Sequence, residues 1–124
     1  MTTQRFTKDQ RLLTPADFKR VMDGAEFKAH HSNFLLLAKS SVFPSDRIGF
    51  IIAKKKIKLA VDRNRVKRCV RDTFRRQPAV TQALDIVFLA KPALGLLSSH
   101  DLHSELAKGL QQLHRKYANT LSGQ

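Results

Sequence analysis

The sequence predicts a single α+β domain, a sandwich in which helices pack on a small sheet. The first observation is a set of three short apolar runs with strand character, at residues 33–39, 47–53 and 85–91. The second is a set of three segments with helical spacing of apolar residues, at residues 14–23, 61–77 and 100–118. The order along the chain is therefore helix–strand–strand–helix–strand–helix. With 124 residues, we expect one domain over residues 1–124 and an ordered core at about residues 11–118.

The first helix is predicted from the chemistry of its start. Thr14 is a residue type that caps helices, Pro15 suits the first helical position, and Asp17 takes the acidic place of a capping box. We expect the helix to end near Asp23, with Gly24 in the left-handed conformation. Spacings of three and four residues give this helix one apolar face, made of Phe18, Val21 and Met22.

The three apolar runs are expected to form the sheet. Residues 33–39 and 47–53 are predicted to form an antiparallel pair, because Pro44-Ser45-Asp46 supplies turn chemistry between them. The third run, residues 85–91, stops before Pro92. None of the runs alternates cleanly between apolar and polar residues, so we expect strands that are buried on much of both faces.

Residues 61–77 are predicted to form a two-faced helix that ends before Pro78. At about 100° per residue, one arc of about 140° is suited to a core. This arc contains Val66, Cys69, Val70, Thr73 and Phe74. Charged and polar side chains occupy most of the opposite side.

The last helix, at about residues 100–118, has an apolar stripe and two candidate caps. The stripe consists of Leu102, Leu106, Leu110, Leu113 and Tyr117. The candidate caps are Ser98 and Ser99.

Positive charge is concentrated in residues 54–76, where eleven Lys or Arg stand against two acids. This stretch therefore carries nine of the thirteen net positive charges of the chain. Because the same stretch has a helical apolar pattern, its charge belongs to a folded surface. A polyanion is the expected partner, since neutralising phosphates releases their condensed counterions.

Several function classes find no support in the sequence. No apolar run approaches the roughly 20 residues of a membrane-spanning helix. The single cysteine, Cys69, excludes an intramolecular disulfide and fits a reducing cytoplasm. We expect a cytoplasmic protein in which Cys69 is a small core residue.

Catalytic and metal-ligating candidates are weak. The ten acids form no close cluster suited to one metal or two, and Asp17, Asp62 and Asp101 are better explained by helix capping and helix dipoles. His100 and His103 stand three residues apart on a predicted helix, but no third ligand is evident. We therefore assign no catalytic residue and no metal site to the protein.

A mixed-sign surface would be expected of a helix face that is merely solvated. Here Arg63, Lys67, Arg71 and Arg75 form a row of like charge at every fourth position, which favours a bound counter-anion. The lysines at positions 54–56 extend the positive field into the preceding loop. Asn64 adds donors and an acceptor near the helix start, where phosphate and 2′-hydroxyl groups can be bound. The spacing alone does not decide which nucleic acid is bound.

The segment AKKKIKLAVDRNRVKRCVRDTFR, residues 53–75, contains the block Arg63-Asn64-Arg65 between further basic residues. With RLLTPADFKRVM before it and DIVFLAKP after it, the chain resembles the protein subunit of bacterial ribonuclease P. The resemblance covers about residues 11–118. It implies a partner RNA that, with magnesium, hydrolyses a phosphodiester to remove the 5′ leader of precursor tRNA. It also implies a left-handed strand–helix–strand crossover, where general topology rules would predict a right-handed one.

The resemblance also implies site residues. Binding of the catalytic RNA would use Lys54, Lys55, Arg63, Asn64, Arg65, Lys67, Arg68 and Arg71, to which the run of lysines adds Lys56. The leader would lie in a cleft between the first helix and the sheet. Phe18 matches the leader-facing aromatic of the family, and Met22 stands where a second aromatic is often found. Phe34 is a candidate partner on the sheet, with Phe50 as another, and the alternative for both rings is a place in the core.

Two other classes remain open. A non-enzymatic protein that binds structured RNA, of the ribosomal type, would share the charge and the architecture. A protein nuclease would cleave RNA by itself. A DNA-binding role is not excluded by charge, although no helix-turn-helix or zinc-finger spacing is present.

Overall fold

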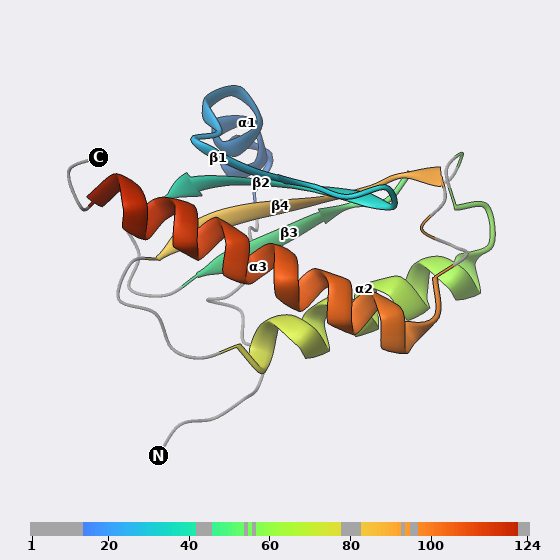
Figure 1. The fold of residues 1–124 in the computed structure, drawn as a ribbon. Coiled ribbons are helices and arrows are strands. Elements are labelled where there is room, and N and C mark those ends of the chain that lie inside the picture. Colours follow the sequence, from blue (N-terminus) through green and yellow to red (C-terminus); the bar gives the residue numbers. More distant parts are fainter. Residues whose placement is uncertain are drawn as a thin grey trace, which may run out of the picture.

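A computed structural model describes residues 14–41, 46–53, 55, 57–77, 83–92, 94 and 97–121 (Figure 1). Three helices and four strands follow one another along the chain. They are α1 (Pro15–Gly24), β1 (Phe27–His30), β2 (Phe34–Ser40), β3 (Arg47–Ile51), α2 (Ala60–Arg75), β4 (Leu84–Ala90) and α3 (Ser99–Leu121). The predicted α+β class is confirmed.

The four strands form one mixed sheet in the order β1-β2-β4-β3. β2 runs antiparallel to both β1 and β4, whereas β3 and β4 are parallel and are connected through α2. Figure 1 shows α2 and α3 on one side of this sheet and α1 on the other. The hand of the β3-α2-β4 crossover stays a prediction.

The two central strands, β2 and β4, are buried on much of both faces, as their continuous apolar runs predict. Alternate residues of β2 and β4, among them Phe34, Leu36 and Phe88, join the larger core with α2 and α3. The residues between them point the other way, where Leu37 and Val87 pack with Val21 of α1. The register pairs Leu36 with Phe88 and Leu37 with Val87, so each face of the sheet is continuous across the two central strands.

One expectation about the sheet is wrong, and one strand was not predicted. Residues 33–39 and 47–53 are not a pair, because β4 lies between β2 and β3. β1, with only four residues, was not expected; it forms a hairpin with β2 in which Phe27 faces Ala38. Of the predicted turn Pro44-Ser45-Asp46, residues 44 and 45 lie outside the described residues.

Capping chemistry explains where α1 and α3 begin. Thr14 Oγ1 accepts a hydrogen bond from the backbone N–H of Asp17 at 3.1 Å, and Ser98 Oγ accepts one from Asp101 at 3.1 Å. The expected left-handed Gly24 is wrong. Gly24 belongs to the last turn of α1, its φ lies outside the left-handed range, and Ala25 follows at φ −57°.

A cluster of charged side chains joins α1 to the sheet. Asp85 of β4 is 0% exposed and accepts hydrogen bonds from Arg47 Nε at 2.9 Å and from Arg47 Nη2 at 2.8 Å. Arg20 of α1 donates to the same carboxylate. Asp17 Oδ1 lies 3.6 Å from Arg47 Nη2, so the Asp17 carboxylate serves this cluster in addition to its place at the helix start. Hydrogen bonding to Asp85 raises the pKa of Arg47.

Gly109 marks the closest approach of α3 to the sheet. A Cβ atom at this position would lie 2.8 Å from Cδ1 of Leu36, which is 0% exposed. We expect Gly109→Val to lower the free energy of unfolding by about 1–3 kcal/mol, because the extra methyl groups overpack the core. Urea denaturation would measure this, with Gln111→Val on the exposed face of α3 as the control for helix propensity. Equal losses in both variants would contradict the close approach.

Candidate nucleic-acid interface

Helix α2 separates an apolar face from a basic one, as predicted. Its buried residues are Val66, Cys69, Val70, Thr73 and Phe74. This face packs into the core with α3 and the sheet. The remaining surface carries most of the six basic residues of the helix, with Asp62 in the first turn to offset the helix dipole.

Three polar side chains in the middle of α2 are unengaged. The side chains of Asn64, Lys67 and Arg68 make no hydrogen bond or ion pair with any other described residue. Asn64 and Arg68 are exposed, and Lys67 is half-buried. Their donors are therefore available to an external acceptor.

Other basic residues of α2 have partners within the protein. Arg65 donates to Ser99 Oγ at 3.3 Å, and the guanidinium of Arg71 lies 5.4 Å from the ring centroid of Phe50, a cation–π arrangement. Arg75 pairs with Asp72. Arg75, the last member of the predicted row of like charge, is thus neutralised by the Asp72 carboxylate. The case for a counter-anion rests chiefly on the middle of the helix.

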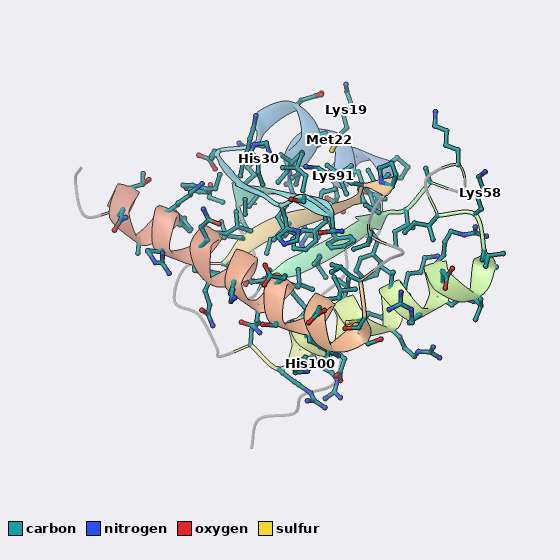
Figure 2. All side chains as sticks on the ribbon, turned by 45° about the vertical axis from the view of Figure 1, so that its right-hand side comes forward. Lys19, Met22, His30, Lys58, Lys91 and His100 are labelled. Carbon is teal, nitrogen blue, oxygen red and sulfur yellow. The ribbon has the colours of Figure 1, made fainter. Side chains whose placement is uncertain are left out.

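Arg63 occupies an unexpected position. Its Nη1 atom donates to the backbone oxygens of Ile57 and Lys58, each at 2.9 Å. Figure 2 shows Lys58 extending away from the body of the protein, beside the start of α2. Lys55 is exposed, while Lys54 and Lys56 lie outside the described residues.

The α1 side of the sheet carries a second surface of interest. Phe18 is half-buried and packs against Val21, Leu37 and Val87. Met22 is 41% exposed, and Figure 2 shows it on α1, on the far side of the sheet from α3. Phe18 and Met22 are thus both on the side of the sheet where a leader surface is predicted.

Three apolar side chains of the sheet extend this surface and were not predicted. Leu35 and Leu89 are half-buried and pack against the same cluster as Phe18. Ile51, which pairs with Leu89 in the sheet register, is 37% exposed. Along each strand these residues alternate with core residues, and this alternation could have identified them. It shows which residues face α1 only once the strand pairing is known.

Phe34 does not belong to this surface, which corrects the sequence-based prediction. Phe34 is 1% exposed, and its ring lies 4.5 Å from that of His31 and 5.3 Å from that of Phe88, in the core with α2 and α3. Phe50 is on the same side, beneath Arg71. Neither ring can face a ligand on the α1 side.

The histidines serve mainly to attach α3 to the rest of the fold. His31 Nε2 lies 2.9 Å from Glu105 Oε1, and His114 Nε2 lies 2.7 Å from Asp46 Oδ2. The hydrogen bond with His31 lowers the pKa of Glu105. His103 contacts Thr73 of α2, whereas His100 is exposed. Within the described ranges, no group of three His, Cys, Asp or Glu side chains could hold a metal ion.

Cys69 is a core residue, as interpreted from the sequence. It is 4% exposed, and its Sγ donates to the backbone oxygen of Ser99 at 3.5 Å. Burial raises the pKa of the thiol, which keeps it protonated and unreactive. In the part of the chain that the structure covers, no helix has both the length and the apolar character needed to cross a bilayer.

The family model described as Ribonuclease P matches residues 6–114. The ribonuclease P protein component of Pseudomonas entomophila is 42% identical over 115 residues, which cover 93% of this chain and 86% of that protein. The corresponding protein of Acinetobacter baylyi is 42% identical over 116 residues, covering 94% of this chain and 88% of the relative.

Solved structures agree with the fold. The RNase P protein of Thermotoga maritima superposes with a TM-score of 0.68 at 25% identity, covering 85% of this chain and 96% of that chain. The RNase P protein of Staphylococcus aureus gives a TM-score of 0.74 at 23% identity, covering 82% and 93%, which supports the fold alone.

Proposed function

The chain belongs to the ribonuclease P protein family, and from this premise we propose that it binds the catalytic RNA of ribonuclease P and the 5′ leader of precursor tRNA. Membership of the family implies participation in an endoribonuclease complex with an RNA partner. The finer proposal is that the partner RNA carries the chemistry. The protein would then assist by lowering the repulsion between two sets of phosphates.

One observation carries this proposal: α2 buries an apolar face and leaves Asn64, Lys67 and Arg68 without partners among the described residues. A positive surface on a rigid helix can track a ribose-phosphate backbone without reorganisation. The proposed RNA-binding set is that of the sequence prediction apart from Arg63, whose Nη1 atom binds two backbone oxygens, and it has Lys67 and Arg68 at its centre. Arg65 and Arg71 lie beside them.

Magnesium is proposed to act on the RNA. The described residues offer no cluster of three metal-ligating side chains, so they do not fit a magnesium site of their own. The metal would supply charge neutralisation and an activated nucleophile at the RNA. The contribution of the protein would be its positive field, which favours close approach of the substrate.

The leader is proposed to lie on the α1 side of the sheet. Phe18 and Met22 come from the helix, and Leu35, Leu89 and Ile51 come from the strands. Such a surface can accept unstacked bases through apolar and stacking contacts, without reading one sequence. Phe34, which is buried on the other face, has no part in it.

Truncating Phe18 tests this placement. We expect Phe18→Ala to weaken the affinity of the holoenzyme for precursor tRNA by about 1–3 kcal/mol, the usual value of one base–aromatic stack, and to leave mature tRNA affinity nearly unchanged. Equilibrium binding of both RNAs to the reconstituted complex would measure the two affinities. Lys19→Ala is the matched control on α1, because Lys19 is 78% exposed and paired with Asp23. Equal losses for both RNAs would contradict a leader surface at Phe18.

The identity of the RNA partner can be tested directly. Tagged protein would be purified from the cells that express it, and the RNA bound to it would be sequenced. We expect one structured RNA that removes the leader of precursor tRNA. Recovery of ribosomal RNA alone would support the non-enzymatic alternative instead.

A further inference from the structure

The start of α2 lacks the usual side-chain cap. Leu59 occupies the N-cap position and makes no capping hydrogen bond from its side chain. Leu59 is 62% exposed and Val61 is 67% exposed, so burial of these two side chains stabilises the first turn only slightly. Another interaction must therefore fix the backbone that leads into α2.

Arg63, which lies within the helix, makes this interaction. Its Nη1 atom donates to the oxygens of Ile57 and Lys58 at 2.9 Å, and these two residues come directly before the N-cap. Both hydrogens of Nη1 are therefore used inside the protein. The same chain is held from its other side, because Ile57 is 4% exposed in the core and its N–H donates to Ala53 O at 3.1 Å.

The neighbouring basic residues differ from Arg63. The side chains of Lys67 and Arg68 make no hydrogen bond with any described residue, whereas the side chain of Arg63 is half-buried and binds two backbone carbonyls. A charge-assisted donor between two carbonyls has a planar, fixed geometry that an ammonium group does not reproduce. Guanidinium shape, more than charge, is what this position uses.

We propose that Arg63 is a positioning residue, which fixes the chain at Ile57 and Lys58 and so sets where Lys55 and Lys58 meet the RNA. This inference rests on the proposed function, because it assigns a part in RNA binding to the loop before α2. It separates Arg63 from Lys67 and Arg68, whose own charges contact phosphate. Arg63 acts through the lysines that precede the helix.

The substitution Arg63→Lys separates shape from charge, with Arg63→Ala as its companion. Arg68→Lys and Arg68→Ala are the matched pair at an exposed position of the same helix. We expect both Arg63 variants to lose on the order of tenfold in affinity for the catalytic RNA at 0.15 M salt, as for two lost phosphate contacts. We expect Arg68→Ala to lower the salt slope by about 0.7–0.9, and Arg68→Lys, which keeps the charge, to lose less affinity than Arg68→Ala. At position 63, by contrast, the lysine and alanine variants should lose affinity alike.

A readout on the free protein accompanies the binding assay. A lysine-specific protease should cut after Lys58 faster in both Arg63 variants than in the parent, while both Arg68 variants should be cut at the parental rate. Thermal unfolding would be followed in parallel, so that a general loss of stability is recognised by faster cutting at all lysines.

The outcomes distinguish the two levels of the proposal. Parental RNA affinity in Arg63→Lys, or unchanged cutting after Lys58 in both Arg63 variants, would overturn the positioning role. If the parent protein showed no salt-dependent affinity for the catalytic RNA, the proposed function would fail. The protease result would still show whether Arg63 fixes the loop before α2.

Discussion

Replacing Asp85 by alanine is expected to lower the free energy of unfolding by about 3–5 kcal/mol, the cost of breaking a buried ion pair from one side. Asp85 is 0% exposed, and Arg47, which donates two hydrogen bonds to it, is 7% exposed. The variant would leave a buried guanidinium without its main anionic partner. It would also remove the anchor of Arg20, which ties α1 to the sheet.

Urea denaturation of the parent and the variant measures this loss. The matched control is Asp23→Ala, which removes an exposed pair with Lys19 and should change stability by less than about 1 kcal/mol. A loss in Asp85→Ala no larger than in the control would show that the cluster does not dock α1. Because Phe18 and Met22 are on α1, we also expect the Asp85 variant to bind precursor tRNA less selectively.

Removing the two charges in the middle of α2 that have no partner among the described residues should cause a large loss of RNA affinity and the largest change in its salt dependence. We expect the double variant Lys67→Ala with Arg68→Ala to bind the catalytic RNA on the order of tenfold more weakly at 0.15 M salt, because two phosphate contacts are lost. The plot of log affinity against log salt should become shallower by about 1.4–1.8. Stability should hardly change, since neither side chain has a partner among the described residues.

Filter binding over a series of salt concentrations gives both quantities. The control with the same loss of charge is Lys19→Ala with Lys108→Ala, two exposed lysines on α1 and α3 that pair with acids. An equal change of slope in the control would mean that overall charge, and not the face of α2, governs binding.

Local structure could be predicted from the sequence because its causes are local. The two faces of α2 follow from a spacing of 3.6 residues, and the starts of α1 and α3 follow from Thr14 and Ser98 as caps. The concentration of charge on one helix was visible for the same reason. These features need no knowledge of what packs against them.

Strand pairing could not be predicted in this way. β4 lies between β2 and β3 although it comes last in the chain, and a four-residue β1 carries too little pattern to be recognised. The error at Phe34 follows from the same cause. In a strand buried on both faces, Phe34 and Leu35 look alike until the pairing shows that Phe34 faces α3 and Leu35 faces α1.

The partners of the charged residues were equally hidden. A count of charges treats Arg63, Arg68 and Arg75 as equivalent, yet one binds carbonyls, one is unengaged and one pairs with Asp72. Asp85 and Arg20 are 65 residues apart in the chain and meet only in the fold. Such contacts depend on tertiary structure, so the sequence could identify the basic surface but not how its members divide their roles.

The central claim is that this chain binds RNA while its partner RNA performs the cleavage. Its most direct test is leader removal from precursor tRNA at low magnesium, with RNA-free protein, catalytic RNA, and the two together. We expect no cleavage by the protein alone, slow cleavage by the RNA alone, and fast cleavage at the mature 5′ end by the mixture. Cleavage by the RNA-free protein, or a mixture no faster than the RNA alone, would contradict this claim.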